Sequence, residues 1–345
     1  MPSPRVAASE NWHGKTGPFL SVIVPVYNDW DKVTHCISSI LNQKQPPSFE
    51  VIVVDDGSTH EAPRFPEVSN LTLVRENHMG VSHARNRGIE VARGELLLFV
   101  DSDCVLKPNC LCELERTFRE RPQQLAFQLH IVGENSTMVG RAEWLNLHAI
   151  QSVLTDHDGC IRWLNTAGFA VVRSFVLSTG LRFEPRAIRA QDTYLLSELI
   201  RKGHLPYLAT NCVVDHCVGL GITEYIYKSF RTAFATQRTY TLIQSNGVRV
   251  HATAEQRLRI FKAMIANANG RQFGLSAFLV AICRYASGKM GLIIARRLRC
   301  GQGRMARGFD FARGVTNCLH DGNLPSLDNP AQCPARERQA NDHRQ

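Results

Sequence analysis

The chain has 345 residues, of which 44% are hydrophobic and 21% are charged. This balance is ordinary for a globular protein with a real hydrophobic core, and it argues against a wholly disordered chain. The formal net charge of +9 favours a partner rich in phosphate, such as a nucleotide, a nucleic acid or an anionic membrane, without choosing among them.

Eleven cysteines are scattered along the chain, and no CxxC pair occurs among them. This pattern gives poor support to a structural zinc site and indicates reduced thiols. Residues 1–17 are polar and lack the apolar core of a signal peptide, so we expect them to form a flexible N-terminus. Together these features predict a cytoplasmic protein.

The first hundred residues alternate between strand and helix patterns. Four short apolar runs predict buried strands, and two segments with helical spacing lie among them. The strand runs are Leu20–Pro25, Phe49–Val54, Leu71–Val74 and Glu95–Val100, and the helical segments are Asp29–Gln43 and Gly80–Arg93. Helices between strands imply right-handed crossovers, so the sequence predicts an α/β fold with a mostly parallel sheet covered on both faces.

The character of the sequence changes at about residue 223. Residues 251–313 hold twelve basic residues and two acidic ones. The longest apolar stretch, 273–295, is interrupted by Arg284 and Lys289, and it predicts one or two buried or surface-lying helices. We therefore expect an α/β domain over 18–222 and a helical basic region over 223–320. Residues 321–345, rich in Pro, Asn, Gln and charge, predict a disordered tail.

The basic C-terminal region has two interpretations of equal weight. It can form a peripheral contact with a membrane, which would place the protein at the inner face of the membrane. It can also be a helical lid or a dimer element whose arginines face water. A nucleic-acid partner is not expected, because few aromatic residues lie among the arginines between 284 and 313.

Polar clusters follow three of the predicted strands. They are Pro25–Asn28, Asp55–Ser58 and Asp101–Asp103. In parallel α/β sheets ligands bind beyond the carboxyl ends of the strands. The sequence therefore predicts one binding site at this edge of the sheet.

Two clusters have the chemistry of a metal site. Asp101-Ser-Asp103 follows a buried strand and suits Mg²⁺ or Mn²⁺, which prefer one or two carboxylates plus substrate phosphates, although such triplets also form turns. A neutral His216 can complete a metal site, or can simply hydrogen-bond to backbone at a strand end. A zinc site that includes the nearby Cys212 and Cys217 lacks a fourth ligand.

Three further residues have both a functional and a structural interpretation. Asp192 opens a helical pattern, where a carboxylate is either a cap or a general base. Tyr27 can stack on a nucleobase or belong to the core. Arg85 can bind a phosphate or face solvent.

Four segments together resemble successive blocks of the family-2 glycosyltransferases. They are Ser21–Asn28, Val51–Thr59, Asn77–Gly88 and Gly94–Asp103, and the resemblance covers about residues 18–220. It implies a GT-A fold, a Rossmann-like sandwich, followed here by the helical basic extension. The activity it implies is metal-dependent, inverting transfer of a sugar from a nucleoside diphosphate sugar, with UDP favoured over GDP or TDP.

The resemblance also implies roles for individual residues. Pro25, Tyr27 and Asp56 would hold the nucleobase, with Arg85 and Ser102 near the nucleotide sugar. Asp101 and Asp103 match the DxD motif that binds Mn²⁺ or Mg²⁺, and His216 matches a late histidine near the metal and diphosphate. Asp192 matches the catalytic base that takes the proton of the acceptor hydroxyl.

The acceptor side departs from the family pattern. Gln191 stands where members usually carry a glutamate before the catalytic aspartate. The segment Trp163–Phe169, which includes Gly168, resembles the acceptor-side loop, but Phe169 replaces a small polar residue. The acceptor class therefore stays open among glycans, lipid-linked acceptors and small molecules with a hydroxyl group.

Two other functions are compatible with parts of the pattern. The Gln191 departure suits a catalytically inactive module that binds nucleotide sugars, whereas retention of Asp101, Asp103, Asp192 and His216 argues against it. A nucleotidyltransferase would usually show a glycine-rich phosphate loop near the first strand, and Pro25–Asn28 contains no glycine.

Overall fold

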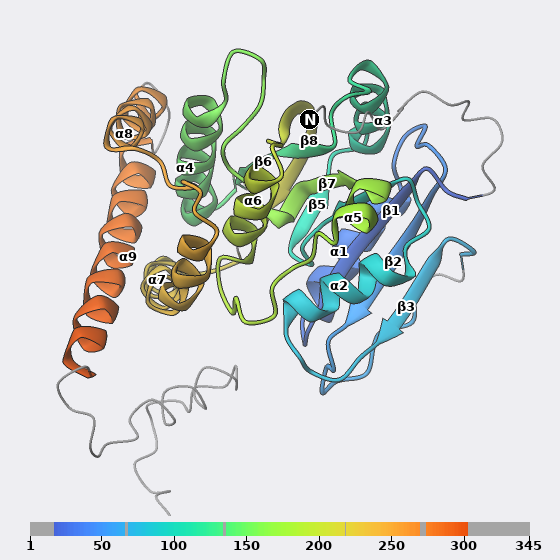
Figure 1. The fold of residues 1–345 in the computed structure, drawn as a ribbon, viewed down its shortest axis with the longest axis horizontal. Helices are drawn as coiled ribbons and strands as arrows, with labels where there is room; N and C mark the ends of the chain where they lie inside the picture. Colours follow the sequence, from blue (N-terminus) through green and yellow to red (C-terminus); the bar gives the residue numbers. More distant parts are fainter. Residues whose placement is uncertain (1–16, 66–67, 134–135, 218, 270–273, 303–345) are drawn as a thin grey trace, which may run out of the picture. The chain divides into compact units, whose positions relative to one another are not determined.

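The computed structural model describes residues 17–65, 68–133, 136–217, 219–269 and 274–302 (Figure 1). Residues 1–16 of the expected flexible N-terminus and the whole of the expected tail over 321–345 lie outside these described residues. One compact unit ends at Arg296 and contains the sheet and its covering helices.

The described residues form one eight-stranded sheet with the strand order β3-β2-β1-β4-β7-β6-β8-β5. The first four strands of that order are parallel to one another. The pairs β4–β7, β7–β6 and β8–β5 are antiparallel, whereas β6–β8 is parallel. The strands are β1 (Leu20–Val26), β2 (Phe49–Asp55), β3 (Leu71–Arg75), β4 (Leu96–Phe99), β5 (Cys104–Leu106), β6 (Ala126–Gly133), β7 (Phe169–Val172) and β8 (Tyr207–His216).

The mostly parallel α/β sheet expected from the sequence is therefore confirmed, with the antiparallel pairs confined to its second half. Every residue of β1 is buried, because helices cover both faces of the parallel part of the sheet. The helices are α1 (Trp30–Leu41), α2 (Val81–Val91), α3 (Cys110–Glu120), α4 (Met138–Leu154), α5 (Arg173–Thr179), α6 (Gln191–Arg201), α7 (Ile222–Ser245), α8 (Ala254–Ala268) and α9 (Gly274–Gln302), with a short 3-10 turn η2 (Thr166–Gly168).

Two glycines allow close approaches that set the geometry of the first crossover. A Cβ atom at Gly88 in α2 would lie 2.3 Å from Ile23 Cγ2 in β1. A Cβ atom at Gly94 would lie 2.5 Å from the backbone nitrogen of Ser21. Only glycine fits both positions, so α2 rests directly on β1 and leads into β4 beside it.

The C-terminal helices pack on the sheet domain through α4, which contacts both α7 and α8 (Figure 1). A second buried cluster joins residues of α4, α7, α8 and α9: Val139, Ala142, Ala149, Tyr225, Met264 and Ala281. Helices on both sides of residues 222 and 223 therefore share one buried cluster, and the compact unit extends to Arg296. Periodicity identifies helices, but the packing of one helix on another depends on which side chains meet.

Candidate functional site

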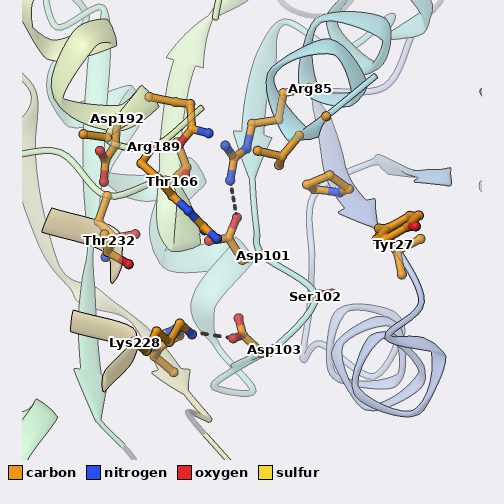
Figure 2. Close-up of a pocket in the computed structure, with 18 of the residues that line it drawn as sticks. Tyr27, Arg85, Asp101, Ser102, Asp103, Thr166, Arg189, Asp192, Lys228 and Thr232 are labelled. Atoms are coloured by element: carbon orange, nitrogen blue, oxygen red, sulfur yellow. Dashed lines mark hydrogen bonds and ion pairs between the residues drawn. The ribbon is translucent and has the colours of Figure 1, made fainter. Parts of the chain in front are cut away.

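A cavity of about 670 Å³ opens at the carboxyl ends of β1, β2 and β4, beside the end of β8. All three polar clusters that follow the predicted strands contribute to its lining. The expected site residues that line it are Pro25, Tyr27, Asp56, Arg85, Asp101, Ser102, Asp103, Gln191, Asp192 and His216. Figure 2 shows Tyr27 on one side of this cavity, Asp192 and Thr232 on the other, and Asp101 between them.

Asp101 makes a charged hydrogen bond with Arg85 of α2. The Nη2 atom of Arg85 donates to Oδ1 of Asp101 at 2.6 Å (Figure 2), and the Arg85 side chain is only 5% exposed. The guanidinium carbon of Arg85 also lies 5.3 Å from the centre of the Phe183 ring. Arg85 is thus a buried, oriented cation at the cavity wall and not a solvated surface arginine.

Asp103 and His216 face each other across the other end of the acidic cluster. Nε2 of His216 lies 3.6 Å from Oδ2 of Asp103, and its Nδ1 lies 3.9 Å from Oε1 of Glu143. Burial raises the pKa of Asp103, but the hydrogen bond and charge of His216, with Lys228 and Lys32, outweigh it and bring that pKa to about 2. Burial lowers the pKa of His216, but Asp103, Glu143 and Asp101 raise it above its usual value. Both shifts favour the charged form of the side chain.

The donor atoms of this cluster suit a divalent cation that is shared with a diphosphate. Carboxylate oxygens and an imidazole are ligands that Mn²⁺ accepts, and Mg²⁺ and Mn²⁺ sites at nucleotides take few protein ligands. Within the described residues, no three Asp, Glu, His or Cys side chains already converge as a complete metal site. The Asp101 carboxylate pairs with Arg85, and the Asp103 carboxylate lies toward His216. These side chains therefore fit a metal ion only where a bound ligand supplies further oxygen atoms.

The wall formed by β1 and β2 presents an aromatic stack and a buried carboxylate. The rings of Tyr27 and His78 are stacked, with 4.0 Å between their centroids and 23° between their planes. Asp56 is 3% exposed and accepts hydrogen bonds from the backbone N–H groups of Met79 and Gly80, at 2.9 Å from each nitrogen. Asp56 therefore holds the turn before α2 in place while it lines the cavity.

Asp192 lies in the first turn of α6. Its Oδ1 accepts from the backbone N–H of Thr193 at 2.7 Å. Burial raises the pKa of Asp192 above its usual value; Thr193 and the charge of Arg85 oppose this shift, and Asp101 adds to it. A carboxylate with a raised pKa at a cavity wall has the electrostatics of a general base.

The backbone just before Asp192 is strained. Ala190 adopts the left-handed conformation, with φ of 59°, which is unusual for a residue with a side chain. The side chain of Gln191 donates from Nε2 to the backbone carbonyl of Ile188 at 2.8 Å and closes this turn. A glutamate at this position would offer no N–H group to that carbonyl, so Gln191 has a structural role of its own.

The acceptor-side segment lines the cavity with residues other than those singled out from the sequence. Asn165 and Thr166 line it, whereas Trp163 and Gly168 are absent from the lining. Trp163 packs against the main hydrophobic core, and a Cβ atom at Gly168 would lie 3.1 Å from Leu129 Cβ. Both residues therefore lie on the side of the loop that faces the hydrophobic core. The sequence alone did not tell which side chains of this loop face the cavity.

The cavity has a second group of lining residues that sequence analysis missed, and four of them come from the C-terminal helices α7 and α9. Glu143, Arg189, Tyr225, Lys228, Thr232 and Arg284 all line the cavity. The Tyr225 hydroxyl donates to Oε2 of Glu143, and the Arg284 guanidinium carbon lies 5.2 Å from the Tyr225 ring centre. Burial raises the pKa of Glu143, but the charge of Arg284 together with His216, Tyr225 and Lys228 outweighs burial and lowers that pKa. No strand-end signal marks these residues, because they enter the site from α4, α7 and α9 and, for Arg189, from the loop before α6.

The fold and the site define a GT-A protein: a parallel half-sheet with an acidic cluster and an aromatic stack at its carboxyl edge. A similar solved structure is the mannosyltransferase PcManGT from Pyrobaculum calidifontis, in complex with GDP-Man and Mn²⁺. The similarity has a TM-score of 0.51 and 20% identity, and it covers 89% of this chain and 88% of that one. At this level of identity the similarity shows the fold alone.

The model of glycosyl transferase family 2 matches residues 21–180, just under half of the chain. Glycosyltransferase AglE of Haloferax volcanii is 42% identical over 96 residues, and glycosyltransferase GlyG of Streptococcus pneumoniae is 35% identical over 108 residues. These segments make up 26% and 30% of this chain. They span about a third of the length of those relatives, 32% and 36% respectively.

Proposed function

We propose that the chain is an inverting glycosyltransferase that moves a sugar from a nucleoside diphosphate sugar, a UDP-sugar, to a hydroxyl acceptor with the help of Mn²⁺ or Mg²⁺. One observation carries the proposal. A single cavity joins the Tyr27 and Asp56 wall, the Asp101 and Asp103 pair and the half-buried carboxylate of Asp192. The similarity of the fold to a mannosyltransferase that binds GDP-Man and Mn²⁺ supports the donor class.

In this proposal the donor lies along the carboxyl edge of the sheet. Tyr27 and Asp56 hold the nucleobase, by stacking and by accepting from a ring N–H. The diphosphate lies toward Asp101 and Asp103, where Arg85 and Lys228 supply positive charge. A divalent cation bound there by Asp101, Asp103 and His216 would neutralise the diphosphate and stabilise charge on the leaving group.

Asp192 acts as the general base in the same scheme. Its carboxylate takes the proton of the acceptor hydroxyl while the oxygen attacks the anomeric carbon from the face opposite the leaving diphosphate. The bond between the acceptor oxygen and the anomeric carbon forms as the bond between that carbon and the diphosphate oxygen breaks. The anomeric centre is thereby inverted. No enzyme nucleophile is needed. Asn165, Thr166 and Thr232 line the cavity with polar groups that suit an acceptor hydroxyl.

Hydrolysis and transfer assays with a panel of UDP-, GDP- and TDP-sugars test the proposal, with Mn²⁺ or Mg²⁺ and with EDTA. The variants are Asp103→Ala and Asp192→Asn, and the control is Asp31→Ala, an exposed aspartate of α1 outside the cavity. We expect metal-dependent release of one nucleotide that both site variants lose and the control keeps.

Calorimetry with the same nucleotides separates the remaining outcomes. Nucleotide binding without turnover, with all acceptor classes supplied, would identify an inactive binding module. Absence of both turnover and binding would overturn the proposal.

A further inference from the structure

The helix α9 has two faces of opposite character. Its inner face consists of small residues that let it approach the rest of the unit closely: Gly274, Ala277, Ala281, Gly288, Gly291 and Ala295. A Cβ atom at Gly291 would lie 2.5 Å from the carbonyl oxygen of Phe230 in α7, and one at Gly288 would lie 3.1 Å from Ser229 Oγ. Gly288 and Gly291 therefore bring this face of α9 close to α7.

The outer face of α9 is apolar and exposed. Its members recur every three or four residues, the spacing of one helix face: Leu275, Leu279, Cys283, Ala286, Met290 and Ile293. Leu275 is 70% exposed, Leu279 55% and Met290 58%. A surface helix whose outer face contacts only water normally turns its large apolar residues toward the core. In α9 these residues lie on the outer face instead.

The apolar surface continues onto α8. Leu258, Phe261 and Ile265 recur at helical spacing there and are all exposed. The rings of Phe261 and Phe278 pack with 5.8 Å between their centroids, which joins the two helices. We call the outer face of α9 together with Leu258, Phe261 and Ile265 the α8–α9 face.

Positive charge surrounds the α8–α9 face. Arg257, Arg259 and Lys262 are exposed on α8, and Lys289 is exposed on α9. Glu255 is the single acidic residue among the described residues of these two helices up to Arg296. An apolar strip with basic residues beside it complements acyl chains beneath anionic headgroups.

The segment Gly274–Ala295 of α9 is long and apolar enough to cross a membrane by length and composition, and 17% of its most apolar window is buried. Its packing nevertheless opposes a spanning position. Arg284, at the middle of the segment, reaches inward to the cavity beside Tyr225, and Gly288 and Gly291 lie against α7. A spanning helix would have to leave these contacts, whereas a helix lying in the membrane plane keeps them.

We propose that the α8–α9 face docks on the surface of an anionic lipid bilayer, with α9 lying in the plane of the membrane. Leu279, Met290 and Phe261 enter the boundary between headgroups and acyl chains, while Arg257, Arg259 and Lys262 contact anionic headgroups. The proposal stands apart from the glycosyltransferase activity. The opposite side of α9 carries Arg284 into the cavity, so docking brings that cavity close to the membrane surface.

Flotation of the full chain with vesicles tests the proposal. The vesicles are pure phosphatidylcholine or phosphatidylcholine with phosphatidylglycerol. The face variant is Leu279→Glu with Met290→Glu. The matched control is Leu73→Glu with Leu177→Glu, two exposed leucines on β3 and α5 that are 40% and 47% exposed. A third variant replaces Arg257, Arg259 and Lys262 by glutamine.

We expect the wild-type chain and the control to float with the anionic vesicles. The face variant should bind about tenfold more weakly or worse, because a charge replaces each apolar side chain that would enter the membrane. The glutamine variant should lose the preference for phosphatidylglycerol. Circular dichroism of each variant checks that it is folded. Equal flotation of the face variant and the wild type overturns the proposal.

Two other occupants of the face give distinct results. A wild-type dimer in light scattering that the face variant breaks, with no flotation of either, identifies a second copy of the chain and overturns the proposal. Resistance of vesicle-bound protein to extraction with alkaline carbonate identifies a spanning helix and overturns it equally.

Discussion

Nη2 of Arg85 lies 2.6 Å from Oδ1 of Asp101, and this contact links α2 to the acidic cluster after β4. Arg85 is buried, and its Nε atom has no hydrogen-bond partner among the described residues. The aspartate thus gains a fixed orientation before any ligand arrives. Because the Arg85 side chain is already ordered, it presents its charge to the cavity and loses no further side-chain entropy when a ligand binds.

Replacement of Arg85 by glutamine should therefore weaken nucleotide binding. Loss of one buried charged partner leaves Asp101 uncompensated, so we expect affinity for the nucleotide to fall roughly 10- to 100-fold. Calorimetric titration with the nucleotide measures the change. Arg87→Gln is the control, because Arg87 lies on the same helix but pairs outside the cavity with Glu76 and Glu90. Equal losses in the two variants would show that helix stability, and not the contact with Asp101, is responsible.

The raised pKa of Asp192 predicts an acid limb in the pH profile of transfer. The base must be deprotonated, so the rate falls as pH drops through a pKa that burial holds above the ordinary value of 3.8. Asp192→Asn should lower the rate by about 10²- to 10⁴-fold and abolish this limb. Measurement of kcat against pH for both proteins gives the answer, and a limb that persists in Asp192→Asn assigns the base elsewhere.

The raised pKa of Asp192 also makes the stability of the fold depend on pH. A carboxyl group with a folded pKa above its unfolded value contributes stability at low pH, and that contribution disappears as pH rises through the folded pKa. Above that folded pKa Asp192 carries its charge in a desolvated position, which disfavours the folded state. Asp192→Asn should therefore raise Tm at pH 7 while it removes activity, as is common for catalytic carboxylates. A lower Tm would mean that Asp192 supports the fold as a helix residue.

Gln191→Glu restores the residue that is usual in the family and tests its role here. The new carboxylate beside Asp192 should raise the pKa of Asp192 further and move the acid limb to higher pH. It also removes the hydrogen bond to the Ile188 carbonyl. Gln191→Ala removes that bond without adding charge, so a shift of the acid limb in Gln191→Glu alone identifies the electrostatic effect. Identical pH profiles in the two variants would contradict it.

A buried network at the start of the sheet should dominate the acid sensitivity of the fold. Glu50, 6% exposed, accepts from Ser21 Oγ and from the Arg93 backbone N–H, each at 2.7 Å. Burial raises the pKa of Glu50, but these hydrogen bonds and the Arg93 side chain lower it below its usual value of 4.5. Its stabilisation is thus complete above pH 4.5 and disappears as pH falls through the lower folded pKa.

Glu50→Gln should lower the free energy of unfolding at pH 7 by about 1–3 kcal/mol, since one buried acceptor oxygen becomes a donor. Urea unfolding at pH 7 and at pH 4 measures the effect, and the difference from wild type should shrink at the lower pH. Glu90→Gln is the control, because Glu90 is exposed on α2. A loss of stability that does not change with pH would point to packing instead of charge.

The parallel arrangement of the first four strands and the edge at which Asp56, Asp101 and Asp103 meet could be predicted from the sequence. Both depend on local patterns: apolar runs define buried strands, and helices between them fix a parallel arrangement whose carboxyl ends share one edge. The turn at Asp192 was also visible, because a helix start has a recognisable composition. In each case a local sequence pattern specifies the structure of the same short segment of the chain.

The other half of the cavity was decided only by the tertiary structure. Glu143, Tyr225, Lys228 and Arg284 reach the site because α4, α7 and α9 pack around shared small and apolar side chains, and such packing leaves no periodic mark in a single sequence. The exposed side of α9 followed from the same packing. A helix with apolar residues all round does not reveal which face it buries, and the glycines that meet α7 made that choice.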